Sequence, residues 1–177
     1  MEAIIEGSLT VGDYLPDITI FEYNPATLLN DKKCIKKWQL SDLAYKKKIV
    51  VIGVTGAFTP VCHNQHLPEF IKYHRQFLQK GVDELWCISP NDPFVMKAWS
   101  ESLKVKNKIR MLSDEAAELA TALNTTIDLS ARGMGLRSDR FVIIAENGQI
   151  VNFVTEMPGQ CTCTDAKAIL ALIGCNE

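Results

Sequence analysis

Residues 49–70 read IVVIGVTGAFTPVCHNQHLPEF, and this stretch decides the fold. Its β-branched start, residues 49–54, is typical of a strand that is buried on both faces. A turn-rich segment follows, with Pro60 just ahead of a predicted helix. Apolar residues then recur near helical spacing up to residue 79, and Gly81 ends the predicted helix. A buried strand that leads directly into a helix is the building unit of an α/β protein.

The same alternation continues along the chain. The further predicted elements are a strand at 85–88, a helix at 94–103, a strand at 109–112, a helix at 113–123, hairpin strands at 141–145 and 150–154, and a closing helix at 164–173. Asn147-Gly148 is the turn of that hairpin. The late hairpin predicts antiparallel members in the sheet, so we expect an α/β fold with a mixed sheet flanked by helices. The lysine-rich part before residue 49 is expected to form an N-terminal β-hairpin extension with a solvated face.

Length and composition indicate one ordinary globular domain, residues 1–177, with 47% hydrophobic and 23% charged residues. A net charge of −2 argues against a general nucleic-acid binder. The most apolar run, 49–54, is far shorter than the roughly 20 residues of a membrane helix. The first residues carry Glu2 and Glu6 and no basic cluster, unlike a targeting segment. We therefore expect a cytoplasmic protein without nucleic-acid or membrane partners, or an organellar one if a leader was removed.

Six cysteines are too few for a disulfide scaffold in a chain of 177 residues, so we expect free thiols in a reducing compartment. Of the six cysteines, Cys62 has the setting most typical of a reactive thiol, because it lies in the predicted first turn of a helix. Unpaired backbone N–H groups and the helix dipole favour the thiolate there, and the thiolate is the nucleophile. Thr59 is placed to donate a hydrogen bond to that thiolate or to an oxygen bound beside it. The alternative is a structural cysteine, since free cysteine is among the most buried residue types.

The segment TGAFTPVC at 55–62, followed by HLPEF at 66–70, resembles the peroxidatic loop of peroxiredoxins, and more narrowly that of the type II, peroxiredoxin-five-like subfamily. Residues 11–17 (VGDYLPD), 88–99 (ISPNDPFVMKAW) and 129–141 resemble further segments of that subfamily, so the likeness spans nearly the whole chain. It implies a thioredoxin-like fold and a thiol-dependent peroxidase that reduces hydrogen peroxide and alkyl hydroperoxides without a metal or bound cofactor. It also implies a thiol reductant, which is thioredoxin, glutaredoxin or glutathione, and suggests a homodimer.

On that pattern Cys62 matches the peroxidatic cysteine, Thr59 the threonine that hydrogen-bonds the peroxide, and Arg140 the arginine that completes the site. Attack by the thiolate moves charge onto the departing oxygen, which fixed donors stabilise, and a guanidinium keeps the thiol ionised. Taken alone, Arg140 would be interpreted as a surface or salt-bridged arginine. Pro60 supports the loop, but Thr55 stands where the family has a proline that shields the cysteine. That exchange predicts lower activity or a more exposed oxidised thiol.

The resulting sulfenic acid must be reduced by a second thiol of the chain or by an external one. Cys163 resembles the resolving cysteine of animal members, and Cys87 resembles that of plant-type members. Cys87 lies in a predicted strand and fits a core position better, whereas Cys163 follows Pro158-Gly159 in a turn that is easier to move. In a further alternative, Cys161 shares or diverts the role of Cys163. A one-cysteine cycle that uses an external thiol is a third possibility. Two cysteines have no assigned role, Cys34 and Cys175.

Other function classes are weighed against the peroxidase. A cysteine hydrolase or a zinc site would pair Cys62 with His63, His66 or His74. All three histidines fall in one helical stretch, which rarely gives the geometry of a hydrolase, and their spacing is not that of paired zinc ligands. For His63 a surface position is the default interpretation. A redox-signalling or binding module with little turnover is the main alternative, because Thr55 departs from the family pattern. A dithiol oxidoreductase is disfavoured, since no Cys-x-x-Cys occurs.

Overall fold

The computed structural model describes residues 8–24, 34–156 and 162–174. Seven strands form one sheet in the order β2-β1-β5-β4-β3-β8-β9. They are β1 (Thr19–Tyr23), β2 (Ile35–Gln39), β3 (Lys48–Gly53), β4 (Glu84–Ser89), β5 (Arg110–Ser113), β8 (Phe141–Glu146) and β9 (Gln149–Thr155). The three central strands β3, β4 and β5 are parallel, while β8 runs antiparallel to β3. This is the mixed, thioredoxin-like sheet that the sequence predicts.

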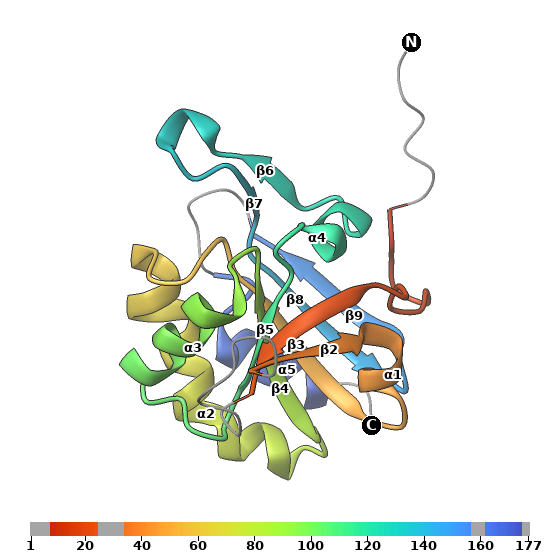
Figure 1. Cartoon of the computed structure of the whole chain (residues 1–177). Helices are drawn as coiled ribbons and strands as arrows, with labels where there is room; N and C mark the ends of the chain where they lie inside the picture. The colour runs from red at the N-terminus through yellow and green to blue at the C-terminus, as the bar shows by residue number, and fades with distance from the viewer. Residues whose placement is uncertain (1–7, 25–33, 157–161, 175–177) are drawn as a thin grey trace.

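Helices cover both faces of the sheet (Figure 1). They are α1 (Leu40–Ala44), η2 (Cys62–His66), α2 (Leu67–Gln79), α3 (Pro93–Ser102), α4 (Glu118–Ala122), η3 (Ser130–Arg132) and α5 (Ala166–Gly174). Side chains of α2, α3 and α5 share one hydrophobic cluster with Val50 and Ile52, whereas α1 and α4 share another with Ile49 and Val51. Consecutive residues of β3 therefore serve opposite cores, as alternation along a strand requires. None of the described helices is long and apolar enough to cross a membrane.

The strand-and-helix unit at 49–79 and the hairpin around Asn147-Gly148 are confirmed by β3, α2, β8 and β9. The predicted N-terminal hairpin is also present, and it joins the main sheet through pairing of β1 with β5. A short hairpin of β6 (Thr126–Asp128) and β7 (Leu136–Ser138) was not expected and stands apart as its own two-stranded sheet. Its strands have three residues each, which is too short for a clear periodic signal.

The predicted helix at 113–123 is wrong at its start, because α4 begins only at Glu118. The carboxylate of Asp114 accepts the backbone N–H groups of Glu118, Leu119 and Ala120, so Asp114 holds this helix start from a distance. Ala117 lies between them in the left-handed region, with φ of 54°. A turn therefore fills the residues that the capping pattern assigned to helix. Burial outweighs these hydrogen bonds and raises the pKa of Asp114 to about 6.

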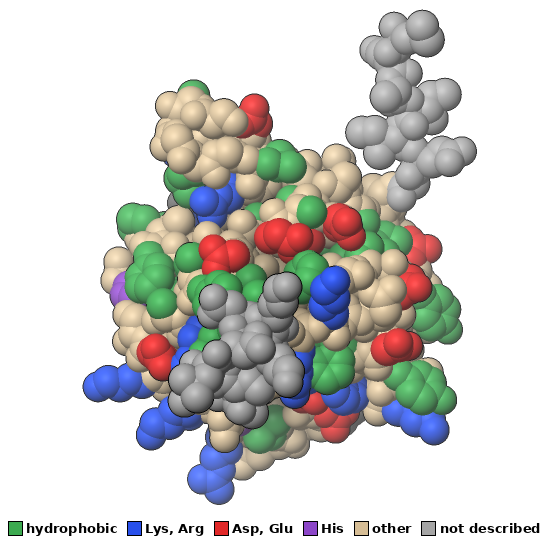
Figure 2. Space-filling view, viewed as in Figure 1, with side chains coloured by type: hydrophobic (Ala, Val, Ile, Leu, Met, Phe, Trp, Pro, Cys, Tyr) green, Lys and Arg blue, Asp and Glu red, His purple; other side chains and the backbone are tan. Residues whose placement is uncertain are grey.

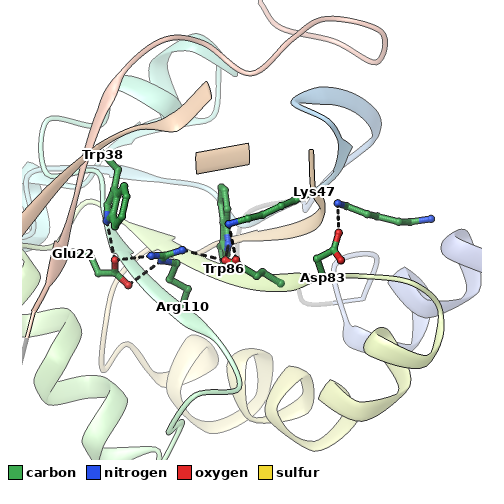
Figure 3. Close-up of polar contacts among 8 residues, drawn as sticks. Glu22, Trp38, Lys47, Asp83, Trp86 and Arg110 are labelled. Carbon is green, nitrogen blue, oxygen red and sulfur yellow. Dashed lines mark hydrogen bonds and ion pairs between the residues drawn. The ribbon is translucent and has the colours of Figure 1, made fainter. Parts of the chain in front are cut away.

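The edge hairpin is fastened by a network around Arg110, the first residue of β5 (Figure 3). The Nε of Arg110 donates to Glu22 of β1 at 2.9 Å, and another guanidinium nitrogen donates to Glu84 of β4 at 3.1 Å. The indole N–H groups of Trp38 and Trp86 donate to the same two carboxylates, each at 2.8 Å. Because each carboxylate has several donors, four neighbouring strands, β2, β1, β5 and β4, are joined at the amino ends of β4 and β5.

A pocket of about 700 Å³ opens beside this network. It includes Glu22, Glu84 and Arg110 and four lysines, namely Lys97, Lys104, Lys106 and Lys108. Lys and Arg side chains gather toward the lower left of the molecule in Figure 2, around the ends of α2 and α3. The pocket lies at the amino ends of the parallel strands. Cys62 follows the carboxyl end of β3, so the pocket and the cysteine belong to opposite ends of the sheet.

Candidate active site

Cys62 is the first residue of η2, the π-helical turn that leads into α2. The backbone is already helical at Val61, and Pro60 occupies the first helical position, one residue earlier than the sequence predicts. The side chain of Cys62 is fully buried, in one cluster with Val54 and Leu67. The thiol therefore sits where a buried strand ends and a helix begins, next to the first N–H groups of that helix.

The loop between β3 and Cys62 is organised by Asn91. The Oδ1 atom of Asn91 accepts the N–H of Ala57 at 2.8 Å, the hydroxyl of Ser89 at 2.7 Å and a guanidinium N–H of Arg137 at 3.4 Å. Gly56 lies so close to this cluster that a Cβ atom there would stand 2.7 Å from a nitrogen of Arg137. The loop is thus held in place from two directions, by the turn after β4 and by β7.

The hydroxyl of Thr59 donates a hydrogen bond to the carbonyl oxygen of Gly56 at 2.8 Å. Its own carbonyl oxygen accepts the N–H of His63 at 2.8 Å, which ties it to the turn that carries Cys62. The hydroxyl proton is therefore engaged within the loop. In this arrangement, the Thr59 oxygen is left as an acceptor for a partner that brings a proton of its own.

Arg140 is buried, with 7% of its surface exposed, which excludes the surface position in the alternative interpretation of a surface or salt-bridged arginine. It directly precedes Phe141, which pairs with Gly53 at the carboxyl end of β3, where the Cys62 loop begins. A Cβ atom on Gly53 would stand 2.2 Å from the Phe141 ring, so only glycine allows this close packing. The charge of Arg140 also contributes to lowering the pKa of His66, which lies in the helix turn that carries Cys62.

His66 lies four residues after Cys62 and is fully buried. One ring nitrogen, Nε2, is 2.9 Å from the carbonyl oxygen of Thr164, which can only accept, so Nε2 carries the proton. The other, Nδ1, is buried without a hydrogen-bond partner among the described residues. Burial lowers the pKa of His66 to about 4; the bond to Thr164 opposes this shift and the charge of Arg140 adds to it.

Cys163 is exposed, in the segment before α5 that His66 contacts through Thr164. The carboxylate of Glu156 accepts the backbone N–H groups of Thr162 and Thr164 at 2.7 Å each, and also that of Cys163. Burial alone would raise the pKa of Glu156, but these hydrogen bonds outweigh it and lower the pKa. Glu156 therefore acts as an anchor for the loop that carries Cys163.

Cys87 is fully buried in β4, between Ile52 of β3 and Met111 of β5. Burial raises the pKa of the Cys87 thiol well above its usual value, and the charge of Cys62 adds to the shift. The expected core position is confirmed, and the two thiols lie within electrostatic reach of each other. Cys34 is buried as well, whereas residues 158–161 and Cys175 lie outside the described residues.

The other two histidines, His63 and His74, have different surroundings from His66. His63 accepts a hydrogen bond from Trp99, so it is not the free surface histidine expected, while His74 lines the pocket at the other end of the sheet. No group of three His, Cys, Asp or Glu side chains in the described part of the chain is arranged to hold a metal ion. Thr55 is half-buried at the start of the loop, and Pro60 is exposed.

Sequence reasoning missed two residues that organise this region, Asn91 and Glu156, and considered a third, His66, only as a hydrolase or zinc partner of Cys62. Asn91 and His66 lie within the motifs quoted above, ISPNDPFVMKAW and HLPEF, so the motifs themselves were a signal that could have identified them. Glu156 carries no local signal, because the N–H groups that it binds lie six to eight residues further along the chain.

Comparison with known proteins gives a consistent result. The Redoxin family model matches residues 10–170. Peroxiredoxin-2C of Oryza sativa subsp. japonica is 40% identical over 162 residues, 92% of this chain and 96% of the relative. The crystal structure of reduced Prx3 of Vibrio vulnificus in complex with H2O2 has a TM-score of 0.84 and 34% identity, covering 93% of this chain and 99% of that chain. Peroxiredoxin 5 of Alvinella pompejana has a TM-score of 0.81 and 32% identity, covering 95% and 99%.

We predict that His66 makes the fold sensitive to mild acid. Its folded pKa of about 4 lies below the ordinary 6.5, so its contribution to stability is complete above pH 6.5 and is lost as the pH falls toward 4. The loss amounts to about 3 kcal/mol. Urea unfolding between pH 7 and 4 measures it. His66→Gln, which keeps a donor for the Thr164 carbonyl, should lack this slope, and His74→Gln should keep most of it. An equal slope in His66→Gln and the parent protein would contradict the assignment.

Proposed function

Because this chain belongs to the redoxin family as a peroxiredoxin of the type II group, and is therefore a thiol peroxidase, we propose that Cys62 is the residue that attacks the peroxide. Peroxides are its substrates and thiols its reductants, and the alternative of a binding module with little turnover is not favoured by these relatives. One observation carries the proposal: Cys62 opens the helix that follows β3, and Arg140 directly precedes the strand paired with β3. The whole chain, residues 1–177, would act as one domain.

The reaction begins when the Cys62 thiolate attacks the oxygen of the peroxide that carries hydrogen. The S–O bond forms as the O–O bond breaks, Cys62 becomes a sulfenic acid, and the other oxygen leaves as hydroxide or alkoxide and takes a proton from solvent. Charge moves from sulfur to the leaving oxygen. The buried guanidinium of Arg140 and the N–H groups of the first helical turn are the fixed donors that stabilise it.

Thr59 would orient the peroxide. Since its hydroxyl proton is donated to Gly56, its oxygen accepts the O–H of the peroxide. A hydroperoxide has only one hydrogen on its O–O unit, so this contact selects the oxygen that is attacked. The sulfenic acid then keeps that hydrogen, and the alkyl-bearing oxygen departs. Pro60 starts the helix and Thr55 opens the loop, in the supporting roles assigned to them from the sequence.

Substitution tests these roles. Cys62→Ser should abolish peroxide consumption, and Arg140→Met should lower kcat/KM for hydrogen peroxide about 10²- to 10³-fold because a charged donor is lost. Thr59→Val should cost about tenfold or more, and it leaves the carbonyl of Gly56 with only the backbone N–H of residue 59, at 3.4 Å. Competition kinetics with a reporter peroxidase would measure all three rates. Arg132→Met, at an exposed site in η3, is the matched control and should leave the rate unchanged. Peroxide turnover that survives in Cys62→Ser would disprove the assignment.

For the next step we infer that Cys163 is the resolving cysteine. It is exposed, and its neighbour Thr164 touches His66 in the turn that carries Cys62. Attack of the Cys163 thiolate on the sulfenic sulfur forms the disulfide and releases the hydroxyl as water. Cys87 is the alternative, supported by its electrostatic contact with Cys62, but its raised pKa disfavours the thiolate that resolution requires. A Cys62–Cys163 disulfide would be reduced by a dithiol such as thioredoxin or glutaredoxin, whereas an unresolved sulfenic acid would need a thiol such as glutathione.

Peptide mapping after one equivalent of hydrogen peroxide distinguishes these routes. We expect a Cys62–Cys163 disulfide in the parent protein and in Cys87→Ser, and sulfenic acid at Cys62 in Cys163→Ser. Cys34→Ser, which removes a buried cysteine with no proposed role, is the control. A Cys62–Cys87 disulfide would transfer the role to Cys87. Sulfenic acid alone in the parent protein would establish a one-cysteine cycle.

We also propose a homodimer that forms through the rim of the site, in a cytoplasmic setting. Three large apolar side chains around Asn91 are exposed: Phe58 by 49%, Phe94 by 46% and Leu136 by 51%. Phe58 follows Ala57, which Asn91 binds; Leu136 precedes Arg137, which Asn91 also binds; Phe94 lies three residues after it. Exposed apolar side chains that gather at one place are typical of an interface.

Sedimentation velocity would test the dimer. The parent protein should sediment as a dimer at micromolar concentration, and Phe94→Glu should sediment as a monomer because it places a charge on the proposed contact surface. Tyr45→Glu changes an exposed aromatic residue after α1, outside this rim, and should remain dimeric. A monomeric parent protein, or a dimer that survives Phe94→Glu, would exclude this surface.

A further inference from the structure

His63, the residue after Cys62, is hydrogen-bonded to α3. The indole N–H of Trp99, in α3, donates to Nδ1 of His63 at 2.9 Å. An indole nitrogen can only donate, so Nδ1 must be the unprotonated acceptor of the His63 ring. Trp99 is fully buried, which means that this histidine is the partner that satisfies a buried N–H group.

Phe58 completes this contact from the loop. Its ring stacks on His63, with centroids 5.8 Å apart and planes 22° apart, and its centroid lies 6.5 Å from that of Trp99. The backbone of Phe58 has φ of 62°, in the left-handed region that aromatic residues rarely adopt. The loop, the turn that carries Cys62 and α3 therefore meet in three side chains, Phe58, His63 and Trp99.

The sulfur of Cys62 is buried, so it cannot meet an exposed thiol such as that of Cys163 while the first turn of its helix stays closed. Opening that turn moves His63, because the two residues are adjacent. We propose that the Trp99–His63 hydrogen bond, backed by Phe58, is a latch that holds this turn closed and sets how often it opens. His63 acts through the helix and is thus a positioning residue. The consequence for catalysis rests on the proposed role of Cys62.

The latch decides between two fates of the sulfenic acid. While the turn is closed, the sulfenate can attack a second peroxide, which oxidises the sulfur to sulfinic acid and releases water or an alcohol. Once the turn opens, a thiol attacks the sulfur, a disulfide forms and water leaves. A tighter latch therefore favours the sulfinic product, and a looser latch favours the disulfide.

Two substitutions at position 63 separate the hydrogen bond from the packing. His63→Phe keeps an aromatic ring against Phe58 but removes the acceptor, whereas His63→Asn supplies an amide oxygen close to the position of Nδ1. Trp99→Phe removes the donor and leaves no buried N–H group behind. If the hydrogen bond is the latch, His63→Phe and Trp99→Phe should have similar effects, and their double variant should show no further effect.

Hydrogen exchange of the reduced protein measures opening without any peroxide chemistry. For the peptide covering residues 61–66, we expect exchange to be about five- to tenfold faster in His63→Phe and Trp99→Phe than in the parent protein, and close to parental in His63→Asn. Exchange that is equal in all the variants overturns the latch. Exchange that is equally faster in His63→Asn also overturns it, because that outcome requires packing alone. If His63→Phe does not fold, Trp99→Phe and His63→Asn carry the test.

The second readout is the fraction of Cys62 converted to sulfinic acid per turnover, measured by intact mass during cycling with peroxide and dithiothreitol. We expect this fraction to fall several-fold in His63→Phe and to return to the parental value in His63→Asn. A fraction that does not change although exchange is faster overturns the link between the latch and the fate of the sulfur. Failure of the proposed function has a different signature, which is peroxide consumption in Cys62→Ser.

Discussion

The burial of the Cys62 sulfur is the constraint on which the rest of this site depends. A thiol without exposed surface can react with a substrate as small as a peroxide, but it cannot reach a protein thiol without a change of shape. On the proposed role of Cys62, the same atom would therefore be enclosed for one half of the cycle and released for the other. A helix end suits this requirement, because its first turn has fewer intrahelical hydrogen bonds than its middle and opens at the lowest cost.

Three tethers hold that first turn, and each reaches a different part of the fold. Asn91 fixes the loop before it, His63 joins it to α3, and His66 joins it to the segment before α5. The last of these also joins the segment that carries Cys163 to the turn of Cys62. Movement of the turn would break the contact between His66 and Thr164, so release of Cys62 and release of the Cys163 loop are coupled through one hydrogen bond. Glu156 opposes the second movement, because it binds three successive N–H groups of that loop.

The sequence was sufficient for the parts of the structure that local pattern determines. The run 49–54, the proline at the helix start and Asn147-Gly148 each have a periodic or turn signal, and β3, the helix after it and the β8–β9 hairpin follow from them. The start of α4 is wrong in the sequence prediction because Asp114 accepts N–H groups that lie beyond a turn. Helix-capping rules do not describe this geometry. The partner of His63 and the burial of Arg140 could not be predicted either. Trp99 is 36 residues from His63, and the burial of Arg140 depends on strand pairing across the sheet.

The direction of the hydrogen bond made by the Thr59 hydroxyl also affects the chemistry. A hydroxyl that donated to the thiolate would lower the charge on the attacking sulfur and slow it. In this structure the proton goes to the carbonyl of Gly56, so the oxygen of Thr59 is free to accept from the substrate. Asn91 holds that carbonyl in place indirectly, because it binds the N–H of Ala57 in the same peptide unit as the Gly56 carbonyl. On the proposed role of Thr59, the loop that shelters the thiol would also fix the acceptor that orients the peroxide, and a change in the loop would alter both the closure of the site and the choice of the oxygen that is attacked.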